Sequence, residues 1–149
     1  MNALLFLAPV LLAVAPQATP APAGSVDGLP LGVLPKQELP RQGCAAYLWT
    51  ASGTRALIAM AGADPARLRL SVGGKIIDLE RSGQVGGAGL GFAESTTYGS
   101  AAIGAKLTMK IETRESITSG GVVSDGILQL DRAGQDSVVV PVAGLIGCA

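Results

Sequence analysis

Histidine is missing from this 149-residue sequence, and its absence excludes several kinds of chemistry at once. Histidine is the usual general base near neutral pH, the partner of serine and cysteine nucleophiles, and a common ligand of zinc. Cysteine is nearly as scarce, because Cys44 and Cys148 are the only two. We therefore expect no cofactor, no metal site and no catalytic residue, and a non-catalytic role is favoured.

An excess of charge and a rich supply of aromatic side chains are also missing. Eleven basic and eleven acidic residues give a formal net charge of zero, and they are scattered without runs. A chain without a basic stripe is not expected to bind nucleic acid or an anionic membrane surface. Past residue 23 the aromatic residues are Tyr47, Trp49, Phe92 and Tyr98, which are too few for a platform that stacks bases.

The sequence begins with an apolar run from Ala3 to Ala15, which is shorter than the roughly 20 residues that cross a bilayer. Small residues follow, and Ala21-Pro22-Ala23 fits a signal peptidase site. Residues 1–23 are therefore predicted to be a signal peptide, with no membrane span after its removal. Because no Lys or Arg precedes the run, an uncleaved anchor is the alternative.

The two cysteines enclose most of the sequence that is able to fold. In an exported chain a lone pair is typically one disulfide, so a bond between Cys44 and Cys148 is predicted. We expect a periplasmic protein, with secretion as the alternative. The seven Arg against four Lys, with abundant Ala and Gly, indicate a GC-rich bacterial genome.

Residues 24–43 are predicted to be a Pro-rich extended tether. Leu-Pro recurs every five residues, at Leu29-Pro30, Leu34-Pro35 and Leu39-Pro40. Each proline excludes helix and favours polyproline-like backbone. The segment is interpreted as a spacer or a strap along the domain. The alternative is a docking segment that offers its three leucines to a partner.

Residues 44–149 are predicted to form a single β domain, because apolar and polar residues alternate with a period of two. The clearest case is a hairpin with Gly73-Gly74 at its turn, in which Leu68 faces Leu79 and Arg69 lies on the opposite face. Further strands are expected at 44–50, 56–61, 106–112, 122–123, 127–130 and 138–142. The segment 56–61 is ambiguous between strand and helix, and strand is favoured.

Two details of the later strands are also predicted. Asp125-Gly126 is expected to be a second hairpin turn. The continuous apolar run 138–142 suits a strand that is buried on both faces or covered on its outer face, with Pro141 at an edge or a bulge.

Seven to nine short strands with turn signals about every ten residues predict an all-β fold, either a small antiparallel barrel or a sandwich. The Cys44–Cys148 disulfide would close it. Closing a loop of about 100 residues is worth about 4–5 kcal/mol in the chain-entropy model.

Carboxylate pairs are the remaining candidates for acid–base catalysis, as in glycosidases. Asp78 and Glu80 share the polar face of the hairpin, and Glu112 lies on another strand. Arg67 and Arg69 on the facing strand account for the first pair as cross-strand counter-charges.

The glycine-rich stretch 83–91 lacks the Gly-Lys-Ser/Thr sequence of a phosphate-binding loop. It is predicted to be a mobile loop that could serve as a contact surface, with Phe92 and Tyr98 as exposed anchors.

Tyr47 and Trp49 are two residues apart and therefore share one face of a strand, opposite Leu48. If Leu48 points into the core, the two aromatic residues form an outward patch of the kind that carries interface energy. If Leu48 points outward, they are core residues.

The plan of an exported small barrel with a cysteine at each end resembles the periplasmic inhibitors of C-type lysozyme. Those inhibitors carry a Ser-Gly-x-x-Tyr segment that reaches into the lysozyme cleft. Here Ser82-Gly83 is followed by Val85 and Gly86 with no tyrosine in place, so inhibition of lysozyme is not expected.

The sequence therefore predicts an exported, non-catalytic binding or support domain of the bacterial cell envelope, with a protein or another envelope component as its partner. A carboxylate-dependent glycan hydrolase and a structural subunit of an envelope assembly are the alternatives.

Overall fold

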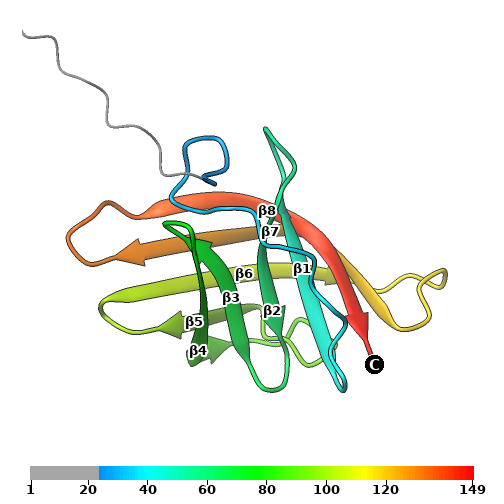
Figure 1. The fold of residues 1–149 in the computed structure, drawn as a ribbon. Helices are drawn as coiled ribbons and strands as arrows, with labels where there is room; N and C mark the ends of the chain where they lie inside the picture. The colour runs from blue at the N-terminus through cyan, green and yellow to red at the C-terminus, as the bar shows by residue number, and fades with distance from the viewer. Residues whose placement is uncertain (1–23) are drawn as a thin grey trace, which may run out of the picture.

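The computed structural model describes residues 24–149, and within them eight antiparallel strands close into a barrel (Figure 1). The strands follow one another around the barrel in chain order. They are β1 (Cys44–Thr50), β2 (Leu57–Gly62), β3 (Arg67–Val72), β4 (Lys75–Val85), β5 (Ser95–Gly99), β6 (Ile103–Glu112), β7 (Gly120–Arg132) and β8 (Val138–Cys148). The predicted all-β fold is confirmed, and it is a barrel. The predicted signal peptide, residues 1–23, lies outside the described residues.

The barrel closes where β8 pairs with β1, and the disulfide lies in this pair of strands. Cys44 is the direct ladder partner of Cys148, with their Cα atoms 4.0 Å apart, and the two sulfurs are bonded. The predicted link between the first and last strands is therefore confirmed.

The β3–β4 hairpin has the predicted register. Leu68 pairs with Leu79, and both side chains are buried. On the outer face Arg69 pairs with Asp78, with 2.7 Å between its Nε and the Oδ1 of Asp78. The two glycines of the turn both have positive φ, which side chains other than glycine rarely adopt.

The core lies inside the barrel and draws on every strand. Alternate residues point inward, and the largest fully buried side chains come from β1, β2, β3, β6, β7 and β8 together with Leu31 of the preceding segment. An eight-stranded barrel is just wide enough for side chains to fill it. The inward face therefore serves packing, which leaves the outer surface for contact with other molecules.

Residues 24–43 lie against the barrel as a strap (Figure 1). Leu31 is fully buried at one end of the barrel, where the Gly32 amide donates to the Ser71 carbonyl at 2.9 Å. The strap then passes along the outside of β1, where the Tyr47 hydroxyl donates to the Glu38 carbonyl at 2.7 Å. Leu34 is buried whereas Leu39 is 65% exposed, so the leucines of the Leu-Pro pairs are not displayed together.

We name the two ends of the barrel by what lies at each, the strap or the disulfide. The strap end carries residues 24–32 and the β3–β4 turn. The disulfide end carries Cys44, Cys148 and the loop between β4 and β5. No helix long and apolar enough to cross a bilayer occurs in the described range.

The prediction of a hairpin turn at Asp125-Gly126 is wrong. β7 continues through both residues, and its register to β8 shifts between Val123 and Gly126, as in a β-bulge. A Cβ at Gly126 would lie 3.1 Å from both the Thr108 carbonyl oxygen and the side chain of Val142. The glycine is therefore explained by the close approach of neighbouring strands rather than by a turn.

The prediction that the 138–142 run is covered on both faces is also wrong. Val140 and Val142 are buried, but Val139 is 57% exposed and Pro141 is exposed. In a single-layered barrel only one face of a strand meets the core. Pro141 lies just past the end of β1, where its carbonyl accepts a hydrogen bond from Ala51 at 3.0 Å.

Candidate binding surface

Tyr47 and Trp49 point outward from β1. Leu48 between them is fully buried, so the alternation of the strand turns both aromatic side chains away from the core. Both are half-buried, but for different reasons. Tyr47 is tied to the strap through the Glu38 carbonyl, and burial raises the pKa of its phenol. Trp49 instead lines an open groove.

This groove runs along the outer side of β1 and β8 and has a volume of about 520 Å³. We call it the β1–β8 groove. Its walls include Trp49, Ala51, Arg55, Ala143, Gly144 and Leu145. The β1–β8 ladder pairs every residue of β1, so the floor offers no free strand edge to a ligand. Recognition in the groove must therefore come from side chains.

The groove belongs to a larger apolar surface. Along β8 the outward positions alternate with the buried Val140, Val142 and Ile146, and no polar side chain occurs among them. We call these outward residues the β8 face: Val139, Pro141, Ala143 and Leu145. On the neighbouring strand β7, Ile127 pairs with Pro141 and is 48% exposed. Val139 and Leu145 are 57% and 53% exposed, and exposed apolar side chains gathered in this way mark interaction sites in soluble proteins.

The prediction that Phe92 and Tyr98 are exposed anchors is wrong. Phe92 is 7% exposed and Tyr98 is 3% exposed, and both belong to the core cluster. Burial raises the pKa of the Tyr98 phenol. The chain has few other large side chains, so these two are needed to fill the barrel near its disulfide end.

The glycine-rich loop after β4 folds back on itself. The Phe92 amide donates to the Gly89 carbonyl at 3.0 Å, and the Ala88 amide donates to the Phe92 carbonyl at 2.9 Å. Leu90 between them has a φ of 53° and packs partly against the core. The loop therefore directs its apolar side chains toward the barrel rather than toward a partner.

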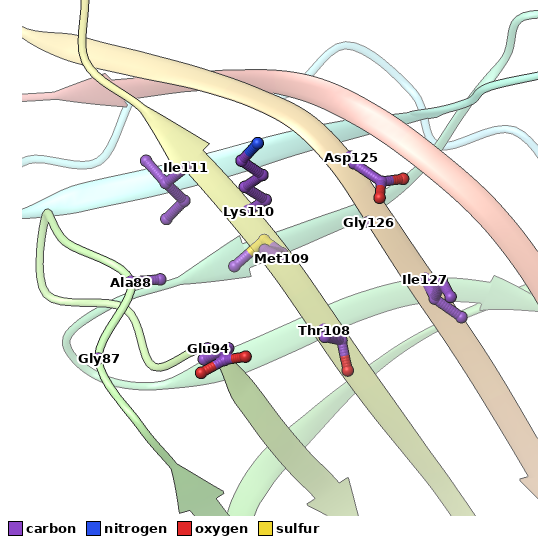
Figure 2. A pocket seen from close by; sticks show the side chains of 10 residues that line it. All are labelled: Gly87, Ala88, Glu94, Thr108, Met109, Lys110, Ile111, Asp125, Gly126 and Ile127. Atoms are coloured by element: carbon purple, nitrogen blue, oxygen red, sulfur yellow. The ribbon is translucent and has the colours of Figure 1, made fainter.

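A second hollow lies over β6, between this loop and the β7 bulge (Figure 2). It measures about 390 Å³ and contains the charged side chains of Glu94, Lys110 and Asp125. Figure 2 shows Glu94 and Asp125 on opposite sides of β6, with Lys110 projecting between the loop and β7. All three residues are exposed. The hollow is therefore open to solvent and holds charges of both signs.

Comparison with family models, curated proteins and solved structures finds no match to this chain. Within residues 24–149 no group of three or more acidic or cysteine side chains is arranged to hold a metal ion.

Two of the carboxylates singled out in the sequence, Asp78 and Glu112, have lowered pKa values. A hydrogen bond from Arg69 lowers the pKa of Asp78, and its outer-face neighbour Glu80 pairs with Arg67 at 3.4 Å. A hydrogen bond from Ser124, followed by the charges of Lys110 and Arg114, lowers the pKa of Glu112. A general acid needs a raised pKa, so these environments favour a structural role.

Arg55 and Leu145 are groove residues that the sequence patterns did not single out. Arg55 lies in the loop between β1 and β2, where residue type alone gives no signal. Leu145 could have been found, because it continues the alternation of Val139, Pro141 and Ala143 beyond the apolar run.

Proposed function

We propose that this chain is an exported, non-catalytic binding domain of the bacterial cell envelope that contacts a protein partner through the β8 face and Trp49. The observation that carries the proposal is the exposed apolar surface of β8. Only the inner face of a strand contributes to the core of the barrel. The apolar side chains on the outer face of β8 are therefore not required for folding, and we attribute them to contact with a partner.

Trp49 strengthens this proposal. Tryptophan is enriched among the residues that dominate binding energy, especially beside a pocket. It stands next to Ala143 in the β1–β8 ladder, so its ring extends the apolar surface onto β1. The paired carboxylates described above favour binding over the glycan hydrolase considered as an alternative.

Photo-crosslinking in living cells tests the proposal. A photoreactive phenylalanine analogue at position 139 lies on the β8 face, and the same analogue at position 76 is the matched control. Ile76 is 51% exposed on β4 and Val139 is 57% exposed, so the two sites are equally accessible. We expect a discrete crosslinked species from position 139 only, lost when Leu145→Asp is added. Equal crosslinking from both positions, or none from position 139, would contradict the proposal.

The compartment is part of the same proposal. The Cys44–Cys148 bond supports an oxidising location, because such bonds persist outside the cytosol. Fractionation with thiol alkylation is the test. We expect the protein in the periplasmic fraction, with both cysteines protected from alkylation until a reductant is added.

A further inference from the structure

We infer that the β1–β8 groove binds a peptide segment that combines apolar side chains with a carboxylate, and that Arg55 is the residue that recognises the carboxylate. This inference rests on the proposed function and names the chemistry of the partner.

Arg55 gives the β1–β8 groove a positive charge. Arg55 is the charged residue of the groove lining, which contains no carboxylate, and the Asp27 carboxylate near the same loop accepts hydrogen bonds from Thr54 outside this lining. Arg67, Arg69 and Arg114 each pair with an acidic side chain on the barrel surface. Arg55 takes part in none of the ion pairs and side-chain hydrogen bonds found within residues 24–149. Its guanidinium therefore remains available to a ligand.

Apolar side chains surround this charge. Trp49, Ala143 and Leu145 give the groove apolar walls, with Leu145 itself 53% exposed. A ligand seated against these walls displaces water from around Arg55. The attraction between a guanidinium and a carboxylate grows as water is excluded, and the planar guanidinium binds both carboxylate oxygens at once.

The charge and the apolar walls of the groove together favour a peptide as the ligand. A membrane surface is recognised by clusters of basic residues, whereas this groove has one arginine and the chain has no net charge. A single cation beside a tryptophan matches one acidic side chain, or a chain terminus, within an apolar peptide. The paired backbone of β1 excludes strand addition, so affinity comes from side chains and selectivity from the charge.

Selection from a random peptide library displayed on phage tests the inference with the purified, oxidised protein. We expect the enriched peptides to be apolar and to carry at least one Asp or Glu. Selection on Arg55→Glu is expected to lose the acidic residues. Lys75→Glu is the matched control, since Lys75 is an exposed cation on β4 outside the groove, and it is expected to select the same peptides as the unaltered protein.

Trp49 is the only tryptophan of the chain, so its fluorescence reports directly on the groove. An enriched peptide is expected to bind at least about tenfold more tightly than its copy with glutamine in place of glutamate, in line with one lost charged contact. Arg55→Glu should remove this preference, and Lys75→Glu should keep it. A preference that survives in Arg55→Glu overturns the inference.

Other occupants give different results. Binding to phosphatidylglycerol vesicles without any enriched peptide would assign the groove to lipid and overturn the inference. A dimer in sedimentation that Leu145→Asp converts to monomer would assign it to a second copy, with the same consequence. If position 139 still crosslinks a partner while selected peptides show no acidic preference, the proposed function stands and this inference fails. If the crosslink is also absent, both fail.

Discussion

Gly144 determines how closely β1 and β8 approach beneath the groove. A Cβ at this position would overlap the Tyr47 carbonyl oxygen and lie 3.2 Å from the Cα of Leu48. Both of those neighbours are backbone atoms of β1, which cannot move aside without opening the ladder. The spacing of the groove walls therefore depends on the absence of one methyl group.

Replacing Gly144 with alanine is expected to lower the free energy of unfolding by about 1–3 kcal/mol, the usual range for overpacking. Urea denaturation followed by Trp49 fluorescence measures it. Gly87→Ala is the control, because a Cβ there meets nothing within 4 Å, and its midpoint should not move. Equal midpoints for Gly144→Ala and the unaltered protein would show that the strands tolerate the methyl group.

The Arg69–Asp78 pair gives the barrel a pH dependence. The pKa of Asp78 is lower in the folded chain than in the unfolded one, because Arg69 donates hydrogen bonds to its carboxylate. A carboxyl of this kind stabilises the fold above its unfolded pKa of about 3.9, and the contribution is lost as the pH falls through the folded value.

Asp78→Asn is therefore expected to destabilise the protein at pH 7 and to make less difference at about pH 2–3. The effect is on the order of 0.5 kcal/mol, since both side chains are partly solvated. Thermal unfolding of Asp78→Asn, Arg69→Gln and the double variant across this pH range measures it. Additive effects of the two changes at pH 7 would rule out coupling between them.

At the scale of the element, the strap acts as the lid of one barrel end. Leu31 is fully buried, and the amide of its neighbour Gly32 donates a hydrogen bond to the Ser71 carbonyl on β3. Asp27 adds a second attachment by accepting hydrogen bonds from the amide and hydroxyl of Thr54 at 2.8 Å.

Leu31→Ala is expected to cost about 2–5 kcal/mol, as for other leucines in a core. Leu39→Ala, on the exposed part of the same strap, should change stability by less than about 0.5 kcal/mol. Chemical denaturation of both variants tests this. Equal, small effects would mean that the strap contributes little to the packing of the barrel.

The elements also show what the sequence could and could not predict. The β3–β4 hairpin was predictable to the register, because a two-glycine turn and strict alternation leave one solution. Asp125-Gly126 carries an equally good turn signal. At this position, however, glycine is needed because β6 and β8 approach closely, and such contacts between distant segments cannot be predicted from the local sequence. The prediction for the run 138–142 failed because it equates apolar residues with buried ones, whereas the outer face of this run is apolar and exposed.

At the scale of the whole molecule, the disulfide and the closing ladder lie in the same pair of strands. The bond spans 104 positions of sequence, so breaking it frees nearly the entire barrel in the unfolded state. This closure was predictable from two cysteines. The groove was less so, because Arg55 and Leu145 are brought together by the β1–β8 pairing and lie far apart along the chain.

The double variant Cys44→Ala/Cys148→Ala is expected to lose about 4 kcal/mol of stability in the chain-entropy model. Urea denaturation of this variant and of the unaltered protein, each with and without a reductant, measures the loss. The reductant should shift the unaltered protein to the midpoint of the variant and leave the variant unmoved. A variant as stable as the oxidised protein would contradict this account.

The position of the disulfide also decides how the molecule would respond to a mechanical load. Ala149 directly follows Cys148, so a force applied between Gly24 and Ala149 first detaches the strap from the barrel and then passes through the sulfur bridge to Cys44 without pulling the strands apart. Only residues 24–43 can then be drawn out, for a gain of at most about 70 Å at full extension. In the oxidised protein only residues 24–43 would extend under load, while the disulfide-closed barrel keeps its length. After reduction of the disulfide, the strands of the barrel could also be pulled out.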